Sequence, residues 1–115
     1  MPLKVTLLMD LTKLVGQDKL AEAEKAVFNE FMYMGTTVFK DAESMECTVA
    51  RGNSIISLTI YNAGVAKIEV LHNHGCRSYN TLQGVLNDVV NTIATALNID
   101  RDKIADAIDS VITNH

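Results

Sequence analysis

Residues 54–72 carry the pattern that most constrains how this chain can fold. Apolar and polar side chains alternate along residues 54–61 and again along residues 65–72, as in strands with one buried face. The apolar set consists of Ile56, Leu58, Ile60, Ala66, Ile68 and Val70. The short segment Asn62-Ala63-Gly64 separates the two runs. Two such runs joined by a glycine-containing turn predict a β-hairpin, whose apolar face needs a second layer to cover it.

The rest of the chain supplies further strands and the helices for that layer. Alternation also predicts strands over residues 3–9, 36–39 and 45–49. Helical spacing of apolar residues predicts helices over residues 18–34 and 81–97, and a last helix that runs from the N-cap Asp100 to about Ile112. Asp18 and Asn80 are the expected N-caps of the first two helices, and Gly16 breaks the chain before the first.

This element order, β-α-β-β-β-β-α-α, predicts an α+β fold. We expect a two-layer sandwich in which a mostly antiparallel sheet of four to five strands carries helices on one face. The 115 residues fit a single domain spanning residues 1–115, and their 48% apolar content is enough for a hydrophobic core. The other sheet face is mixed in character, so it could meet a second copy in a homodimer, although an ordinary solvated face is the simpler interpretation.

Charge and cysteine content exclude several classes of partner. The net charge is −4 and the ten Lys and Arg residues are scattered, which argues against nucleic-acid binding. No signal peptide and no apolar run long enough for a bilayer is present, which argues against a membrane partner. With only two cysteines, Cys47 and Cys76, a disulfide framework is not expected. A cytoplasmic location follows as the expectation.

The segment His72-Asn73-His74-Gly75-Cys76-Arg77 concentrates the residues with possible chemistry. In an extended strand His72, His74 and Cys76 would share one side, and these residue types are ligands of zinc or copper. Metal ligands more often come from separate elements, however, and His72 is in phase with Ile68 and Val70. A metal-binding module is therefore one alternative, and a histidine at the edge of the core is the simpler one.

The same segment leads into the start of a long helix, which is a general site for anions. Backbone N–H groups and the positive end of the helix dipole attract negative charge there. Arg77 would add a fixed charge, Tyr79 a stacking surface, and Ser78 and Asn80 polar side chains. These four residues are the candidate site for a small anionic or nucleotide-like ligand, while simple helix capping by Ser78 and Asn80 is the favoured interpretation of the pattern.

Element order and spacing over about residues 3–97 resemble the small prokaryotic S-adenosylmethionine decarboxylases. The similarity rests on Met34-Gly35-Thr36-Thr37-Val38, on the hairpin with residues 63–70, and on a cysteine before a helix. Members of that family cleave themselves at an internal serine, which becomes a pyruvoyl group. The resemblance implies Ser54 as that serine and Cys76 as the family's acid. The catalytic motifs are not retained, because Asn53-Ser54-Ile55 stands where the family has Glu-Ser-His.

These observations lead to a ranked set of functional hypotheses. The first is a non-enzymatic binding or regulatory domain, such as an inhibitor, that acts as a homodimer on a protein or a small anionic ligand. No catalytic residues and no cofactor are expected on this hypothesis. The alternative is a small decarboxylase-like enzyme, either of the pyruvoyl type from Ser54 or dependent on a Cys76 thiolate. The metal-binding module is the third.

Overall fold

The hairpin that the alternation predicts lies at the centre of the structure. The computed structural model describes residues 2–32, 37–40, 44–51, 54–61, 64–73 and 78–114. Strands β4 (Ser54–Tyr61) and β5 (Val65–Asn73) pair antiparallel, with Leu58 opposite Ile68. All six apolar residues of the predicted inward set are buried, which confirms the predicted faces of both strands.

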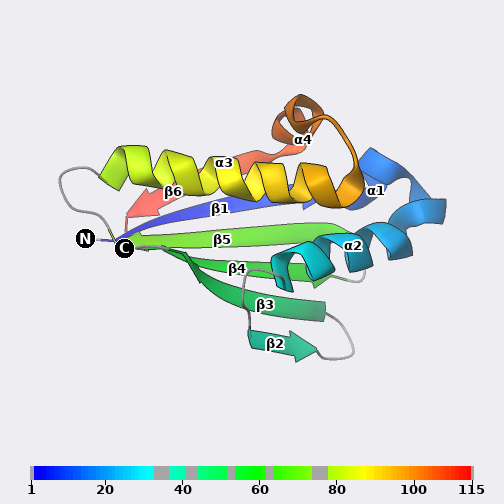
Figure 1. Cartoon of the computed structure of the whole chain (residues 1–115), viewed down its shortest axis with the longest axis horizontal. Coiled ribbons are helices and arrows are strands. Elements are labelled where there is room, and N and C mark those ends of the chain that lie inside the picture. The colour runs from blue at the N-terminus through cyan, green and yellow to red at the C-terminus, as the bar shows by residue number, and fades with distance from the viewer. Residues whose placement is uncertain are drawn as a thin grey trace.

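The two strands are the middle of a six-stranded antiparallel sheet with the order β2-β3-β4-β5-β1-β6. Strand β1 (Pro2–Asp10) lies between β5 and β6 (Asp109–Asn114), and it pairs with both. On the other side of the hairpin, β3 (Ser44–Arg51) pairs with β4, and β2 (Thr37–Lys40) forms the far edge. The ribbon in Figure 1 shows this order across the sheet.

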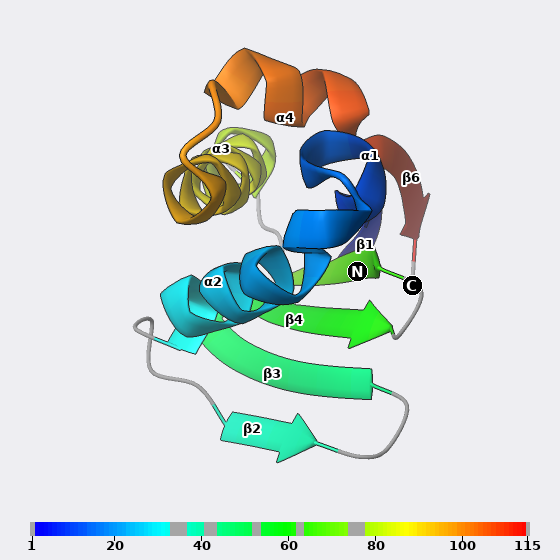
Figure 2. The same ribbon diagram turned by 90° about the vertical axis from the view of Figure 1, so that its right-hand side faces the viewer.

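The helices gather on one side of the sheet, which gives the predicted two-layer α+β sandwich (Figure 2). They are α1 (Leu11–Val15), a 3-10 turn η1 (Gln17–Lys19), α2 (Leu20–Met32), α3 (Ser78–Leu97) and α4 (Arg101–Ala107). The side chains of Val27 and Phe31 from α2, and of Val89 and Ile93 from α3, are fully buried against the sheet. Among the helices in the described ranges, none has both the length and the apolar character needed to cross a bilayer.

The predicted last helix is wrong in its second half. Helix α4 ends at Ala107, and the chain from Asp109 to Asn114 is strand β6, which pairs with β1 from Leu3↔Asn114 to Leu8↔Asp109. The segment contains Val111, Ile112 and Thr113, three consecutive β-branched residues that favour strands. The segment therefore pairs with the open edge of β1 instead of continuing the helix. As a result, the described sheet has six strands instead of the predicted four or five.

Helix starts also differ from the predicted caps. Gly16, with φ of 83°, ends the short helix α1, so the predicted break is confirmed. Helix α1 itself is N-capped by Asp10, whose Oδ1 accepts a hydrogen bond of 3.0 Å from the N–H of Thr12. Asp18 lies inside η1 instead of capping a helix. Helix α3 begins at Ser78, which places Asn80 in its first turn.

The turn of the central hairpin is locked against the start of the helical layer. Gly64 has φ of 87°, and its carbonyl accepts a hydrogen bond of 2.9 Å from the N–H of Leu11. A Cβ added at this position would lie 2.6 Å from Thr12 Oγ1 and 3.0 Å from Leu20 Cδ1. Both the backbone conformation and the space therefore require glycine at this turn.

We predict that Gly64→Ala lowers the free energy of unfolding by about 2 kcal/mol or more, because it adds backbone strain and a steric clash. Gly84 on α3 is the matched control, since nothing lies within 4 Å of a Cβ there. Gly84→Ala should stabilise the protein by roughly 0.5–1 kcal/mol, as in other helix interiors. Urea denaturation of both variants measures the two effects, and equal changes would contradict the prediction.

Candidate functional site

A buried polar pair interrupts the apolar core where β4 begins and β5 ends. Ser54 and His72 are directly opposite each other in the β4–β5 register. Both face the helical layer and are only 1% and 0% exposed. Ser54 Oγ lies 2.5 Å from His72 Nδ1, a short hydrogen bond between side chains. The two residues that sequence reasoning treated separately thus form one unit.

The second ring nitrogen of His72 has no partner among the residues that the structure describes. Nε2 is buried and makes no hydrogen bond with any of them. When Ser54 donates to Nδ1, the neutral ring carries its proton on Nε2, which then needs an acceptor. A buried polar group left unpaired costs roughly 1–3 kcal/mol, so native proteins seldom keep one without a reason. The ring is therefore suited to hold a ligand atom or water.

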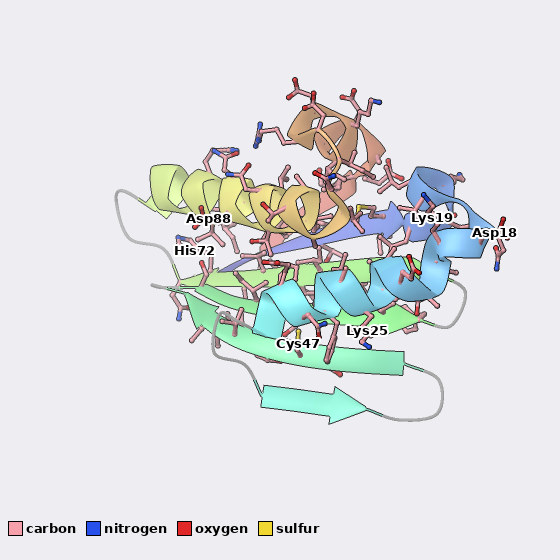
Figure 3. All side chains as sticks on the ribbon, turned by 45° about the vertical axis from the view of Figure 1, so that its right-hand side comes forward. Asp18, Lys19, Lys25, Cys47, His72 and Asp88 are labelled. Atoms are coloured by element: carbon pink, nitrogen blue, oxygen red, sulfur yellow. The ribbon has the colours of Figure 1, made fainter. Side chains whose placement is uncertain are left out.

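His72 lies at the end of the sheet where α3 begins. Figure 3 places its side chain between the sheet and the first half of α3, and Figure 1 shows the chain entering α3 at the same end. Helix α3 has 20 residues, so its first turn presents free N–H groups and a full dipole. The buried imidazole and the positive helix end thus share one corner of the molecule.

The predicted site residues fall only partly within the described chain. His74, Cys76 and Arg77 lie outside the described residues. The backbone of Ser78, Tyr79 and Asn80 forms the first turn of α3, but the side chains of these three residues lie outside the described part. In the ranges that are described, no three His, Cys, Asp or Glu side chains gather as a metal site would require. The metal site at His72, His74 and Cys76 stays a prediction.

Cys47 carries the other thiol, and its surroundings are those of an inert core residue. It faces inward from β3 beneath α2 (Figure 3) and is 1% exposed. Burial is the main cause that raises the pKa of its thiol to about 11, and the nearby Glu46 carboxylate adds to this effect. Since the thiolate is the reactive form, Cys47 is no nucleophile at neutral pH.

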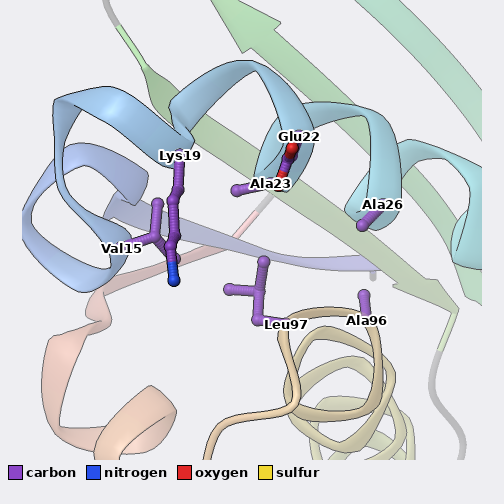
Figure 4. A pocket seen from close by; sticks show the side chains of 7 residues that line it. All are labelled: Val15, Lys19, Glu22, Ala23, Ala26, Ala96 and Leu97. Atoms are coloured by element: carbon purple, nitrogen blue, oxygen red, sulfur yellow. The ribbon is translucent and has the colours of Figure 1, made fainter.

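A shallow cavity of about 190 Å³ opens at the opposite end of α3. Figure 4 shows its walls, which are formed by Val15, Lys19, Glu22, Ala23, Ala26, Ala96 and Leu97. Small alanine side chains on both α2 and α3 leave this space where the helices approach each other. Among these lining residues only Lys19 and Glu22 have polar side chains, so the cavity lacks the converging polar groups of a specific ligand site.

No family model matches the chain, and no curated protein matches its sequence significantly. The likeness to S-adenosylmethionine decarboxylases therefore stays a prediction from element order.

The Ser54–His72 contact could have been found from the sequence. The turn is centred on Ala63, and residues 54 and 72 are equidistant from it. Counting outward from the turn in an antiparallel hairpin places them opposite each other, and parity with Ile56 and Val70 turns both inward. The information that pairs these two residues is the register of the hairpin. The alternation within either strand shows only which side chains point inward.

We predict that Ser54 and His72 are energetically coupled. Ser54→Ala and His72→Phe should each cost about 1–3 kcal/mol, because each leaves a buried polar partner unpaired. The double variant should cost less than the sum, with a coupling energy of about 1–2 kcal/mol. Chemical denaturation of the four proteins gives the cycle.

Ser57→Ala is the control for this cycle. Ser57 lies on the same strand but on the outer face, where its hydroxyl is 3.4 Å from that of Thr48. Loss of this partly exposed contact should change the stability by less than about 0.5 kcal/mol. Strict additivity of the Ser54 and His72 changes would show that the pair is not a unit.

Proposed function

We propose that this chain is a non-enzymatic binding or regulatory domain that holds a small anionic ligand at the start of α3 and works as a homodimer. The observation that carries the proposal is the buried Nε2 of His72, which has no partner among the described residues. Its neighbour Ser54 fixes the ring by a hydrogen bond to Nδ1. An immobilised donor beside a helix N-terminus matches what an oxyanion needs.

The chemistry of the corner favours an anion over a cation. The helix dipole places partial positive charge at the first turn of α3, and that turn contains no acidic residue. In the tautomer whose Nδ1 accepts from Ser54, Nε2 carries the proton and is a hydrogen-bond donor, which suits an anion better than a metal ion. Arg77, which immediately precedes α3, supports the same proposal through its charge.

The wider setting of the proposal follows from composition. A buried, unreactive Cys47 and the scattered basic residues support a cytoplasmic protein that does not bind nucleic acid. On this proposal, ligand binding would control how the domain regulates or inhibits a protein partner. The partner would bind a second surface of the domain.

The ligand site predicts stabilisation by phosphate that depends on His72. Thermal unfolding with 10 mM inorganic phosphate, and separately with AMP, should raise the Tm of the native chain by about 2 °C or more through preferential binding to the folded state. His72→Phe should remove that rise, because the donor is lost. Isothermal titration calorimetry with the same two compounds measures the affinity.

Two controls separate binding from a general salt effect. Phosphate stabilises many proteins by exclusion from their surface, and this effect would persist in His72→Phe. His115→Phe removes another imidazole and should keep the rise. An equal Tm rise in the native chain and in His72→Phe, or no rise in either, would reject the site.

The Ser54–His72 contact also favours a second candidate, the self-cleaving pyruvoyl enzyme. His72 Nδ1 is placed to take the proton of Ser54 Oγ, which would attack the carbonyl carbon of Asn53. The peptide C–N bond would break to give an ester, and elimination of the Asn53 carboxylate would leave dehydroalanine. Addition of water would then release ammonia and leave a pyruvoyl group at residue 54.

Intact-mass spectrometry decides between the two candidates. The binding domain predicts one uncleaved chain of 12.6 kDa. Self-cleavage predicts two fragments, residues 1–53 and 54–115, with the second beginning in a pyruvoyl group. Ser54→Ala is the control, because it cannot cleave. An intact native chain after prolonged incubation excludes the pyruvoyl candidate and leaves the binding domain standing.

A further inference from the structure

The sheet face opposite the helices carries the large exposed apolar side chains of the described residues. In the described part of the chain the large apolar side chains that are exposed are Leu8, Ile55, Tyr61 and Leu71, at 40%, 47%, 39% and 38%. All four alternate with buried residues of β1, β4 and β5, so all four lie on the open face. Such concentration on one face is typical of an interaction surface.

Four of the outward residues of β5 form a pattern that matches its own reverse. In chain order they are Val65, Lys67, Glu69 and Leu71, which is apolar, positive, negative, apolar, and Asn73 follows them as the last outward residue of the strand. Reading these four residues backwards exchanges the two charges and leaves the apolar ends in place. A second β5 laid antiparallel over the first would therefore put each charge against its opposite and each apolar end against another.

Strand β4 repeats this symmetry beside it. Its outward residues are Ile55, Ser57, Thr59 and Tyr61, which is apolar, polar, polar, apolar. The register places Ile55 beside Leu71 and Ser57 beside Glu69, so the two strands share the same centre. Both halves of the central hairpin thus have a two-fold pattern about one line across the strands.

We propose that the open face binds a second copy of this chain through a two-fold axis that runs perpendicular to the strands, between the two sheets. Lys67 would then face Glu69 of the partner subunit, and Ile55 would face Tyr61 of the partner subunit. Each contact occurs twice, as a two-fold interface requires. The partner is a second copy because the pattern is complementary to itself.

The size of the face fits a stable dimer. Strands of 4 to 9 residues make up the sheet. At spacings of about 4.8 Å between strands and 3.4 Å along them, the face covers on the order of 700 Å². A standard interface buries roughly 800 Å² on each partner, and packed sheets keep their strands within about 30° of each other.

The central charges are already ordered in one subunit. Glu69 accepts from Lys4 Nζ at 2.7 Å and from Lys67 Nζ at 3.1 Å. Chiefly its hydrogen bond with Lys4 lowers the pKa of the Glu69 carboxyl, despite partial burial. Lys67 also lies 5.8 Å from the centre of the Tyr61 ring. Because these side chains are held before association, little conformational freedom is lost on binding.

This dimer rests on the homodimer part of the proposed function and is independent of the ligand site. Ser54 and His72 face the helical layer, whereas the proposed interface uses the opposite face of the sheet. Failure of the phosphate experiment would leave the interface untouched, and a monomeric chain would leave the ligand site untouched.

Charge reversal tests the pairing. Sedimentation equilibrium of the native chain at about 50 μM should give twice the subunit mass of 12.6 kDa. Lys67→Glu alone would place a carboxylate against a carboxylate in both symmetric contacts, and Glu69→Lys alone would do the same with ammonium groups. Each single variant should weaken the dimer at least 100-fold and sediment as a monomer, since repulsion opposes both contacts.

Mixing the two single variants gives the decisive result. The carboxylate introduced at position 67 of one variant would then face the ammonium group introduced at position 69 of the other. An equimolar mixture should therefore return to the dimer mass. The double variant Lys67→Glu with Glu69→Lys should also dimerise alone. Circular dichroism melting of each variant verifies that the subunits are folded.

The matched controls are Lys103→Glu and Asp106→Lys, which change charge by the same amounts at exposed positions of α4. Both should remain dimers. A monomeric native chain, a dimer that survives both single charge reversals, or folded single variants that fail to associate when mixed would each overturn the proposal.

Discussion

The register of the β4–β5 hairpin is the constraint on which the rest of the structure depends. Gly64 precedes β5 with a positive φ, and a Cβ at this position would clash with Thr12, so the turn requires glycine there. Because side chains alternate along a strand, a slip of one residue would exchange the buried and exposed faces. The same register that buries Ile56 and Val70 places Ser54 against His72, and it aligns the outward residues of both strands.

Strands were more predictable than the helices around them. The central hairpin has strict alternation over two runs, so both its partners and its faces follow from the sequence. The segment Asp109–Asn114 misled because Ile104, Ile108, Val111 and Ile112 also fit a helical spacing. What decides its structure is the free edge of β1, about a hundred residues away in the chain, and local periodicity does not contain that information.

The candidate site shows the same division. His72 and the start of α3 were singled out from the sequence pattern itself, whereas Ser54 was implied only by the resemblance to the decarboxylases. The hydrogen bond between Ser54 and His72, and the Nε2 left unpaired among the described residues, depend on how deeply the sheet end is covered by α3. Burial of this kind is a property of two layers packed together, and strand patterns alone predict only which way a residue points.

The position of β1 between β5 and β6 has a consequence for how the chain acquires its structure. Strand β1 precedes both of its partners in the chain, so one of its edges stays open until residues 65–73 have been made and the other until residues 109–114 have been made. Open apolar edges invite pairing with other chains. Such distant pairing slows folding relative to a chain of local contacts. Helix α1 follows β1 directly and is N-capped by Asp10, so it is a local structure that can form before the partner strands of β1 have been made.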